Sequence, residues 1–289
     1  MVEKTQTDYF DEVSDERTLK IYLPDGHLER GGVAKIWRAT RLPYPKRKQL
    51  YVVVESDELH NKYGYPTDHV DRIVLISRRP HNIPTSINNF GGVGISGEDF
   101  IRDRLDIPID SDQIRYADTS GNAVESLLNL QCMPASILAA FRRDYMIRDA
   151  KNVRDAMARF AEKRGGRALI ASEFPQLTMY AMVDIFGVDE AIVEVFKTDG
   201  ATEPFAVWDC DGMVDVAQTG GSIVANDLRA VRPEVLKKTT PHTIVRTDTL
   251  SYHEPIVKEL KGRLQKGVDN LMRDEPEAFV PALSKETFA

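Results

Sequence analysis

The strongest constraint on the fold is an alternation of short apolar runs with a helical pattern in the second half of the chain. Residues 167–174 and 190–196 have the length and composition of strands, and residues 175–187 between them read as a helix. Another apolar run covers residues 212–218. Two neighbouring parallel strands connected by a helix form the βαβ unit. The alternation therefore predicts an α/β fold.

The first half of the chain favours the same layering. Residues 19–24 read as a strand that ends in a tight turn, and a helical pattern follows over residues 31–42. Residues 49–56 and 70–78 are rich in β-branched and apolar side chains, which predicts two strands buried on both faces of a parallel sheet. Residues 57–69, which separate these two runs, are expected to form a loop.

The remaining segments differ in how well they define an element. Residues 90–105 predict a brief strand, a glycine turn and a helix. Residues 127–141 fit either a pair of strands or a helix, because periodicity alone does not separate the two. Residues 146–166 and 253–275 carry apolar side chains at three-to-four spacing, which predicts two amphipathic helices.

The chain is long enough for two lobes. It has 289 residues, and domains of about 100 to 150 residues are the commonest size. We expect two α/β lobes with mixed or parallel sheets flanked by helices. The expected parts are a flexible arm (1–17), lobe I (18–117 and 236–275), lobe II with a phosphate-binding loop (118–235) and a tail (276–289). The arm is inferred from its charged and weakly patterned composition.

Composition and charge exclude some classes of function. The formal net charge of −7 argues against an extended nucleic-acid surface, because such a surface needs clustered Lys and Arg. No run approaches the roughly 20 apolar residues of a membrane span, and residues 1–17 do not resemble a signal peptide. We therefore expect a soluble, cytoplasmic protein that binds neither nucleic acid nor membrane. Cys132 and Cys210 are expected to be buried free thiols.

The clearest chemical signal follows the apolar run at residues 212–218. Thr219, Gly220, Gly221 and Ser222 come directly before a helical pattern. Amides at a helix start bind phosphate, glycines let the backbone approach closely, and the two hydroxyls add donors. The segment therefore predicts a phosphate-binding turn. A glycine-rich turn without a ligand is the alternative, because so short a motif is unspecific.

Two aspartates belong to this strand. Asp211 and Asp215 are four residues apart, which places their side chains about 13 Å from each other in an extended strand. They therefore cannot hold one metal ion together. Asp215 lies just before the turn, where it could reach ribose hydroxyls, or it could brace the loop through backbone amides. Asp211 is expected to be structural or to contact the other lobe.

Five segments resemble, in order, the motifs of one enzyme family. They are LKIYLPDGHL, RPHNIPTSI, GVGISGEDFI, ASEFPQLT, and GATE followed by CDGMVDVAQTGGSIVANDL. Together they resemble ATP phosphoribosyltransferase, the first enzyme of histidine biosynthesis, over about residues 18–275. The resemblance implies two periplasmic-binding-protein-like α/β lobes with a hinge and a cleft between them. It also implies a cytoplasmic homo-oligomer. The family's short forms pair with a histidyl-tRNA-synthetase-like regulatory subunit; this chain is longer than those forms, so such a partner is left open.

The resemblance implies a reaction and a set of site residues. The family joins N1 of ATP to C1 of phosphoribosyl pyrophosphate with release of pyrophosphate, and Mg²⁺ binds the pyrophosphate. The expected catalytic residues are Asp215, on the ribose side, and Glu203. The expected substrate-binding residues are Gln218, Thr219, Gly220, Gly221, Ser222, Arg79, Asp25 and His27. Arg79 would face the nucleotide or the pyrophosphate; a solvated surface side chain is its alternative. No metal-ligating residue is assigned. The family's long forms carry a C-terminal regulatory domain, so histidine feedback within this chain is not expected.

The departures from the family pattern leave the acceptor open. In the first turn, Asp25 stands where the family has Lys or Ser and His27 where it has Arg. Gly92 replaces an Asp, and His81 and Asn82 interrupt an expected acid. Loss of a charged contact to polyphosphate weakens binding by about 1 to 3 kcal/mol. The acceptor is therefore ATP or another nitrogen heterocycle, or the chain is a non-catalytic metabolite-binding regulatory module. His27 is either a general base or a structural residue.

Overall fold

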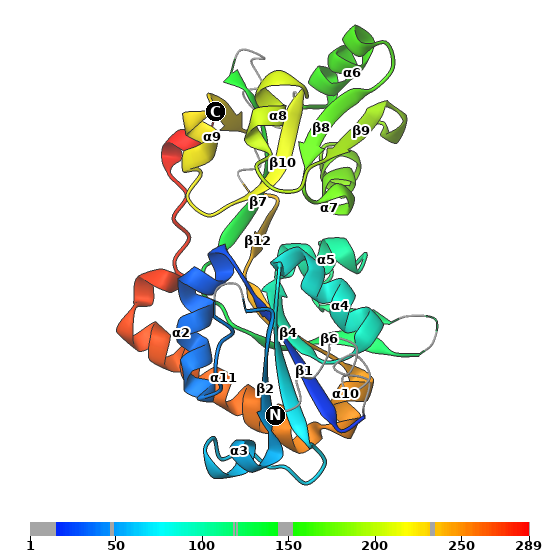
Figure 1. Cartoon of the computed structure of the whole chain (residues 1–289). Coiled ribbons are helices and arrows are strands. Elements are labelled where there is room, and N and C mark those ends of the chain that lie inside the picture. The colour runs from blue at the N-terminus through cyan, green and yellow to red at the C-terminus, as the bar shows by residue number, and fades with distance from the viewer. Residues whose placement is uncertain are drawn as a thin grey trace. The chain divides into compact units, whose positions relative to one another are not determined.

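The structure is a computed structural model that describes residues 16–46, 49–117, 119, 121–143, 153–231 and 235–288. The chain divides into two compact units (Figure 1). Unit 1 comprises Met1–Ile107, Ser111–Met133 and Thr240–Phe279, and unit 2 comprises Pro108–Asp110, Pro134–Thr239 and Val280–Ala289. Each unit is a mixed sheet with helices against it, so the predicted two-lobed α/β fold is confirmed. The predicted cleft and hinge stay predictions.

Unit 1 is built on a seven-stranded sheet with the order β2-β3-β1-β4-β13-β6-β5 in the described residues. Its strands are β1 (Thr18–Pro24), β2 (Tyr51–Glu55), β3 (Arg72–Arg78), β4 (Val93–Gly97), β5 (Arg115–Ala117), β6 (Ala123–Asn129) and β13 (Pro241–Arg246). β1 runs parallel to β3 and to β4, whereas β2, β13 and β5 pair antiparallel with their neighbours. The carboxyl ends of β1, β3 and β4 therefore lie at one edge of the sheet.

Helices cover both faces of this sheet (Figure 1). They are α2 (Ala34–Trp37), α3 (Ser56–Asn61), α4 (Ile83–Phe90), α5 (Glu98–Arg104), α10 (Thr247–Tyr252) and α11 (Glu254–Asp274). Leu19 and Ile21 of β1 pack with α2 and α11, whereas Tyr22 packs with α4 and α5. This is the period of two that a strand covered on both faces requires.

The closing helix α11 confirms the second amphipathic prediction. Ile256, Leu260 and Leu264 are buried along one side of the helix. A Cβ atom at Gly267 would collide with the Ile36 carbonyl group of α2, so only glycine allows the two helices to approach this closely. In the part of the chain that the structure describes, no helix is long and apolar enough to cross a membrane.

Unit 2 is built on a six-stranded sheet in the described residues, with the order β11-β7-β10-β8-β9 and with β12 paired to β7. Its strands are β7 (Ala135–Arg142), β8 (Ala168–Ser172), β9 (Val193–Lys197), β10 (Gly212–Ala217), β11 (Leu228–Ala230) and β12 (Lys237–Thr239). Its helices are α6 (Val153–Arg164), α7 (Pro175–Tyr180), α8 (Glu203–Trp208) and α9 (Gly221–Ala225). β8 is parallel to β9 and to β10, as the βαβ pattern predicts.

Four details differ from the sequence predictions or resolve them. β2 is an antiparallel strand at the sheet edge with Tyr51 exposed, because it pairs with β3 on one side only. The predicted loop at 57–69 holds most of α3, which buries Leu59 and has acidic residues in its first turn, where they favour a helix start. Residues 127–141 form strands rather than a helix. β4 passes at Gly97 directly into α5, as predicted, and a further pair of glycines with positive φ, Gly91 and Gly92, precedes β4.

The boundaries of the two units also differ from those expected. β6 lies in unit 1, because it pairs with β13, and β12 lies in unit 2, because it pairs with β7. The expected tail is divided between the units after Phe279. Residues 1–15 of the expected arm and Ile147 of the expected helix lie outside the described residues, whereas Val153, Met157 and Phe160 of that helix are buried in α6. Cys132 and Cys210 are buried free thiols, as predicted.

Candidate functional site

Acidic and hydroxyl side chains gather where the parallel strands of unit 2 end. Glu173 follows β8, Thr198 follows β9, and Asp215 lies in the second half of β10. Thr202 and Glu203 form the start of α8, and the Thr198 and Thr202 hydroxyl groups are 3.2 Å apart. Ligands of open α/β sheets bind at the carboxyl ends of the strands. This edge is therefore the candidate site of unit 2.

Asp215, at this edge, has a carboxyl group with an unusually high pKa. Its Oδ1 accepts a hydrogen bond of 2.6 Å from the Val216 amide. The pKa of Asp215 is raised to about 7, chiefly by burial and in part by the negative charges of Glu203 and Glu173, while hydrogen bonds from Thr202 and Val216 act in the opposite direction. The carboxyl group therefore changes charge near neutral pH, which is a frequent property of functional residues.

The predicted phosphate-binding turn joins β10 to α9. Gly220 has φ 74°, a left-handed conformation that favours glycine, and the Thr219 hydroxyl accepts a 3.3 Å hydrogen bond from the Gly221 amide. Thr219, Gly221 and Ser222 are exposed, whereas Gly220 is buried. α9 has only five residues, so the backbone amides of the turn and the two hydroxyl groups, rather than a long helix dipole, are what the turn offers an anion.

The other expected residues of unit 2 have distinct positions. Glu203 is half-buried at the start of α8, close enough to Asp215 to raise its pKa. Gln218 precedes the turn and is half-buried. Asp211 accepts hydrogen bonds of 2.7 Å from Arg164 Nε and 2.8 Å from the Leu169 amide, so it joins α6 to β8. The structural role predicted for Asp211 is confirmed.

Asp25, His27 and Arg79 of unit 1 lie just beyond the carboxyl ends of β1 and β3. Because β1 and β3 are parallel neighbours, these residues come to one edge, where Arg79 Nε lies 3.7 Å from Asp25 Oδ2. The Arg79 side chain is 67% exposed, and His27 is exposed. Asp25 Oδ1 is buried without a hydrogen-bond partner among the described residues. The charge of Arg79 is thus partly offset by Asp25.

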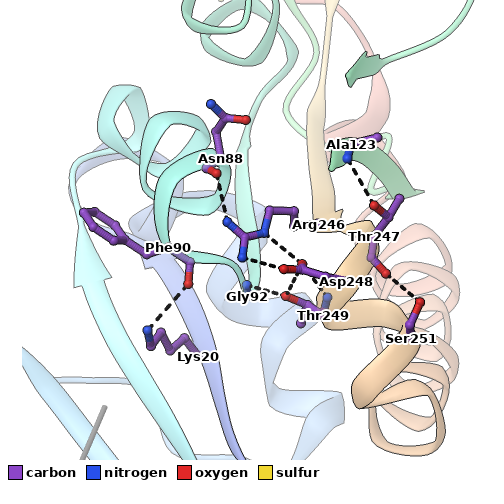
Figure 2. A network of polar contacts seen from close by, with 10 residues as sticks. All are labelled: Lys20, Asn88, Phe90, Gly92, Ala123, Arg246, Thr247, Asp248, Thr249 and Ser251. Carbon is purple, nitrogen blue, oxygen red and sulfur yellow. Dashed lines mark hydrogen bonds and ion pairs between the residues drawn. The ribbon is translucent and has the colours of Figure 1, made fainter. Parts of the chain in front are cut away.

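Gly92 lies at the opposite edge of the same sheet, because it precedes β4, which is parallel to β1. Figure 2 shows it beside Thr249. It has φ 105°, and a Cβ atom there would lie 2.6 Å from the Lys20 carbonyl oxygen. Its amide donates a 2.7 Å hydrogen bond to the Thr249 hydroxyl group. An aspartate at position 92 would therefore force β1 and β4 apart, and the departure from the family pattern at this position has a local structural reason.

Arg246 and Asp248 form the centre of the polar network at that edge (Figure 2). Arg246 donates to both Asp248 carboxylate oxygens, at 2.8 and 2.5 Å, and to the Asn88 carbonyl oxygen at 3.0 Å. Burial raises the pKa of Asp248, but the bonds from Arg246 and from the Thr249 amide outweigh burial and lower it overall. Burial and the charge of Arg246 lower the pKa of Lys20. We interpret this network as a brace between β13, α4 and α10.

Sequence reasoning missed two groups of residues. Glu173 directly follows a predicted strand, and that position at a carboxyl end was the signal that could have found it. A buried pair joins Glu98 Oε1 to Arg102 Nε at 2.8 Å. His242 Nε2 lies 3.9 Å from Glu98 Oε2, and burial lowers the pKa of His242 to about 4. Contacts between α5 and β13 cannot be read from either segment alone.

No group of three or more His, Cys, Asp or Glu side chains that could hold a metal ion occurs in the described ranges. Carboxylate oxygens are nevertheless the ligands that Mg²⁺ prefers, and Mg²⁺ usually takes one or two of them together with substrate phosphates. Asp215 and Glu203 fit that limited role, because they lie near each other beside the turn.

Comparison with known proteins identifies the family. The model of the ATP phosphoribosyltransferase family matches residues 79–266. The chain belongs to this family. The matched range includes Arg79, Glu203, Asp215 and the turn, whereas Asp25 and His27 lie outside it.

A solved structure of an ATP phosphoribosyl transferase (HisG:HisZ) complex from Thermotoga maritima is similar in fold. It is 16% identical in sequence, with a TM-score of 0.59 over 87% of this chain and 98% of the other. At that identity the similarity supports the fold alone. Among curated protein sequences, no match was found.

Proposed function

We propose that this protein is a Mg²⁺-dependent phosphoribosyltransferase that joins the ribose 5-phosphate of phosphoribosyl pyrophosphate to N1 of ATP and releases pyrophosphate. This is the first step of histidine biosynthesis. The observation that carries the proposal is the position of Asp215, Glu203 and the turn at one strand-end edge of unit 2, inside the range that the family matches. We also propose that the protein is cytoplasmic.

The turn would bind the 5′-phosphate through backbone amides and the Thr219 and Ser222 hydroxyl groups, which are exposed. Asp215 and Glu203 would accept hydrogen bonds from the ribose hydroxyl groups. These carboxylates also lie where positive charge develops on the sugar as the bond to pyrophosphate breaks. The transfer needs no covalent nucleophile, since positioning of two bound substrates supplies much of the rate.

Arg79 would contact the departing pyrophosphate or the acceptor nucleotide from unit 1, as its exposed guanidinium group allows. Bound Mg²⁺ would neutralise charge on the pyrophosphate oxygens. Ligand binding should change the protonation state of Asp215. Its carboxylate form is costly in the free protein and becomes favourable once hydrogen-bond donors from a sugar reach it.

The direct test is pyrophosphate release from phosphoribosyl pyrophosphate in the presence of ATP and Mg²⁺. Asp215→Asn should lower kcat/KM at least about 100-fold, the usual scale for loss of a charge-stabilising group. Asp227→Asn is the matched control, because Asp227 carries the same charge in unit 2 but is 75% exposed. No turnover by the wild-type protein with ATP or with any other purine or azole acceptor would contradict the enzymatic proposal.

A different nitrogen acceptor is the second candidate, and the Asp25–Arg79 contact of 3.7 Å favours it. A carboxylate beside the arginine repels a triphosphate and leaves less charge to bind it. Under this candidate, an acceptor without a triphosphate, such as adenosine, turns over faster than ATP, and Asp25→Asn narrows the difference. Faster turnover with ATP in the wild-type protein excludes it.

Binding without turnover would instead favour a regulatory module, particularly if Gly221→Asp left the binding unchanged. The Thermotoga maritima structure is a complex, which supports a partner subunit or self-association for this chain as well. Light scattering of the purified protein, alone and with candidate regulatory subunits, tests that part of the proposal.

A further inference from the structure

The C-terminal segment of unit 2 packs against the candidate phosphate-binding turn. This segment, residues 280–288, is named the C-terminal strap. The Ser284 amide donates a 3.2 Å hydrogen bond to the Thr219 carbonyl oxygen, and the Ser284 and Thr287 hydroxyl groups lie 3.2 Å apart. Phe288 forms a parallel bridge with Ala230 at the end of β11. The strap thus contacts the turn and is fixed to the sheet beyond it.

Thr287 fills the space beside the buried glycine of the turn. Thr287 has an exposed fraction of 0%, and a Cβ atom added to Gly220 would overlap the Thr287 hydroxyl and methyl groups. Leu283 and Phe288 pack against the hydrophobic cluster that holds Ile223 of α9. Gly220 is therefore required for two reasons, its positive φ and the side chain that lies against it.

The Ser284 hydrogen bond also sets the direction of an amide. In a trans peptide the carbonyl and N–H groups point to opposite sides. Because the Thr219 carbonyl group points toward the strap, the Gly220 N–H group of the same peptide points away from it. Thr219 and Ser222 beside it are exposed, whereas Gly220 itself is buried.

We propose that the strap is a positioning element for the sugar-phosphate turn, with Ser284 and Thr287 as the positioning residues. The inference rests on the proposed function of the turn. Two adjacent glycines, the second of which begins the five-residue helix α9, have much conformational freedom in isolation, and ordering them upon ligand binding would cost affinity. The strap supplies that order before the ligand arrives.

Ser284 offers a test of the hydrogen bond that the strap donates to the turn. Its φ of −75° fits proline, so Ser284→Pro removes the amide donor while the backbone conformation is retained. Ser284→Ala, the matched control, loses the hydroxyl group and keeps the amide. Calorimetry with ribose 5-phosphate, and KM for phosphoribosyl pyrophosphate, should show weakening of about 2- to 10-fold for Ser284→Pro relative to Ser284→Ala. The KM for the acceptor and kcat should stay unchanged.

Thr287 provides an independent second variant. Thr287→Ala should weaken ribose 5-phosphate binding because it opens space beside Gly220, and Thr287→Ser should restore part of the affinity. Equal affinities in the wild-type protein, Ser284→Pro and Thr287→Ala would overturn the inference and leave the proposed function standing. No binding of ribose 5-phosphate or phosphoribosyl pyrophosphate by the wild-type protein would overturn both. Thermal unfolding of each variant, measured in parallel, separates lost positioning from lost folding.

Discussion

Asp215 in unit 2 and Asp248 in unit 1 are aspartates with opposite electrostatic surroundings. Asp248 is paired with Arg246 and receives the Thr249 amide, and its pKa is lowered. Asp215 is half-buried near Glu203 and Glu173, and its pKa is raised to about 7. One carboxylate stabilises the fold, whereas the other is kept at a cost to the fold. That difference separates the structural edge of one sheet from the candidate functional edge of the other.

The largest expected effect is on stability at alkaline pH. The unfolded chain loses the Asp215 proton near pH 3.8 and the folded chain near pH 7, so the free energy of unfolding falls as pH rises between these values. Asp215→Asn should therefore stabilise the protein at pH 9 by up to about 4 kcal/mol, and by much less at pH 4. Urea unfolding at both pH values measures this, and equal effects at the two would contradict the comparison.

Removal of Arg246, the cation paired with Asp248, should lower the free energy of unfolding, whereas Asp215→Asn raises it. Arg246→Leu leaves Asp248 partly buried without its partner and should destabilise the protein by about 2 to 3 kcal/mol at pH 7. Urea unfolding of unit 1 reports the loss. Arg273→Leu is the control, because Arg273 forms an ion pair with Asp274 whose side chains are 69% and 62% exposed, and should cost less than about 0.5 kcal/mol.

The contribution of Asp248 to stability should depend on pH less strongly than that of Asp215 and with the opposite sign. Because the folded pKa of Asp248 is lowered, its stabilisation is complete above the ordinary carboxyl pKa and disappears as pH falls through the folded value. Asp248→Asn should thus cost about 1 kcal/mol at pH 7 and progressively less as the pH falls below the ordinary carboxyl pKa. If the destabilisation caused by Asp248→Asn grows upon acidification, the ionised Asp248 paired with Arg246 is not the form that stabilises the protein.

The smallest effect concerns ligand affinity near neutral pH. If the carboxylate form of Asp215 accepts the ribose hydroxyl groups, ligand binding favours that form and releases a proton from the protonated group. The affinity for ribose 5-phosphate, corrected for ionisation of the phosphate itself, should rise a few-fold from pH 6 to pH 8 in the wild-type protein. It should not rise in Asp215→Asn. Calorimetry in buffers of different ionisation enthalpy counts the protons directly.

The sequence predicted best those features that depend on residues close together in the chain. The positive φ of Gly220 and the βαβ order around β8 follow from residues that are neighbours in the chain. Leu59 and its acidic neighbours formed a short helix that the loop prediction missed, because one buried side chain is too little for a periodicity to be recognised.

Long-range contacts account for the rest of what was missed. Ser284 and Thr287 lie more than sixty residues from the turn that they contact, and nothing in either segment predicts the pairing. The Arg79–Asp25 contact depends on β1 and β3 being parallel neighbours, which was expected only in outline. The raised pKa of Asp215 comes chiefly from its burial in the folded chain, with a smaller contribution from Glu173, which follows another strand.

The most direct measurement is a co-crystal structure with phosphoribosyl pyrophosphate. The account predicts density for the 5′-phosphate against the amides and hydroxyl groups of residues 219–222, with the ribose hydroxyl groups within hydrogen-bond distance of Asp215. Density for the sugar phosphate elsewhere, while the turn stays free of ligand, would contradict the central claim.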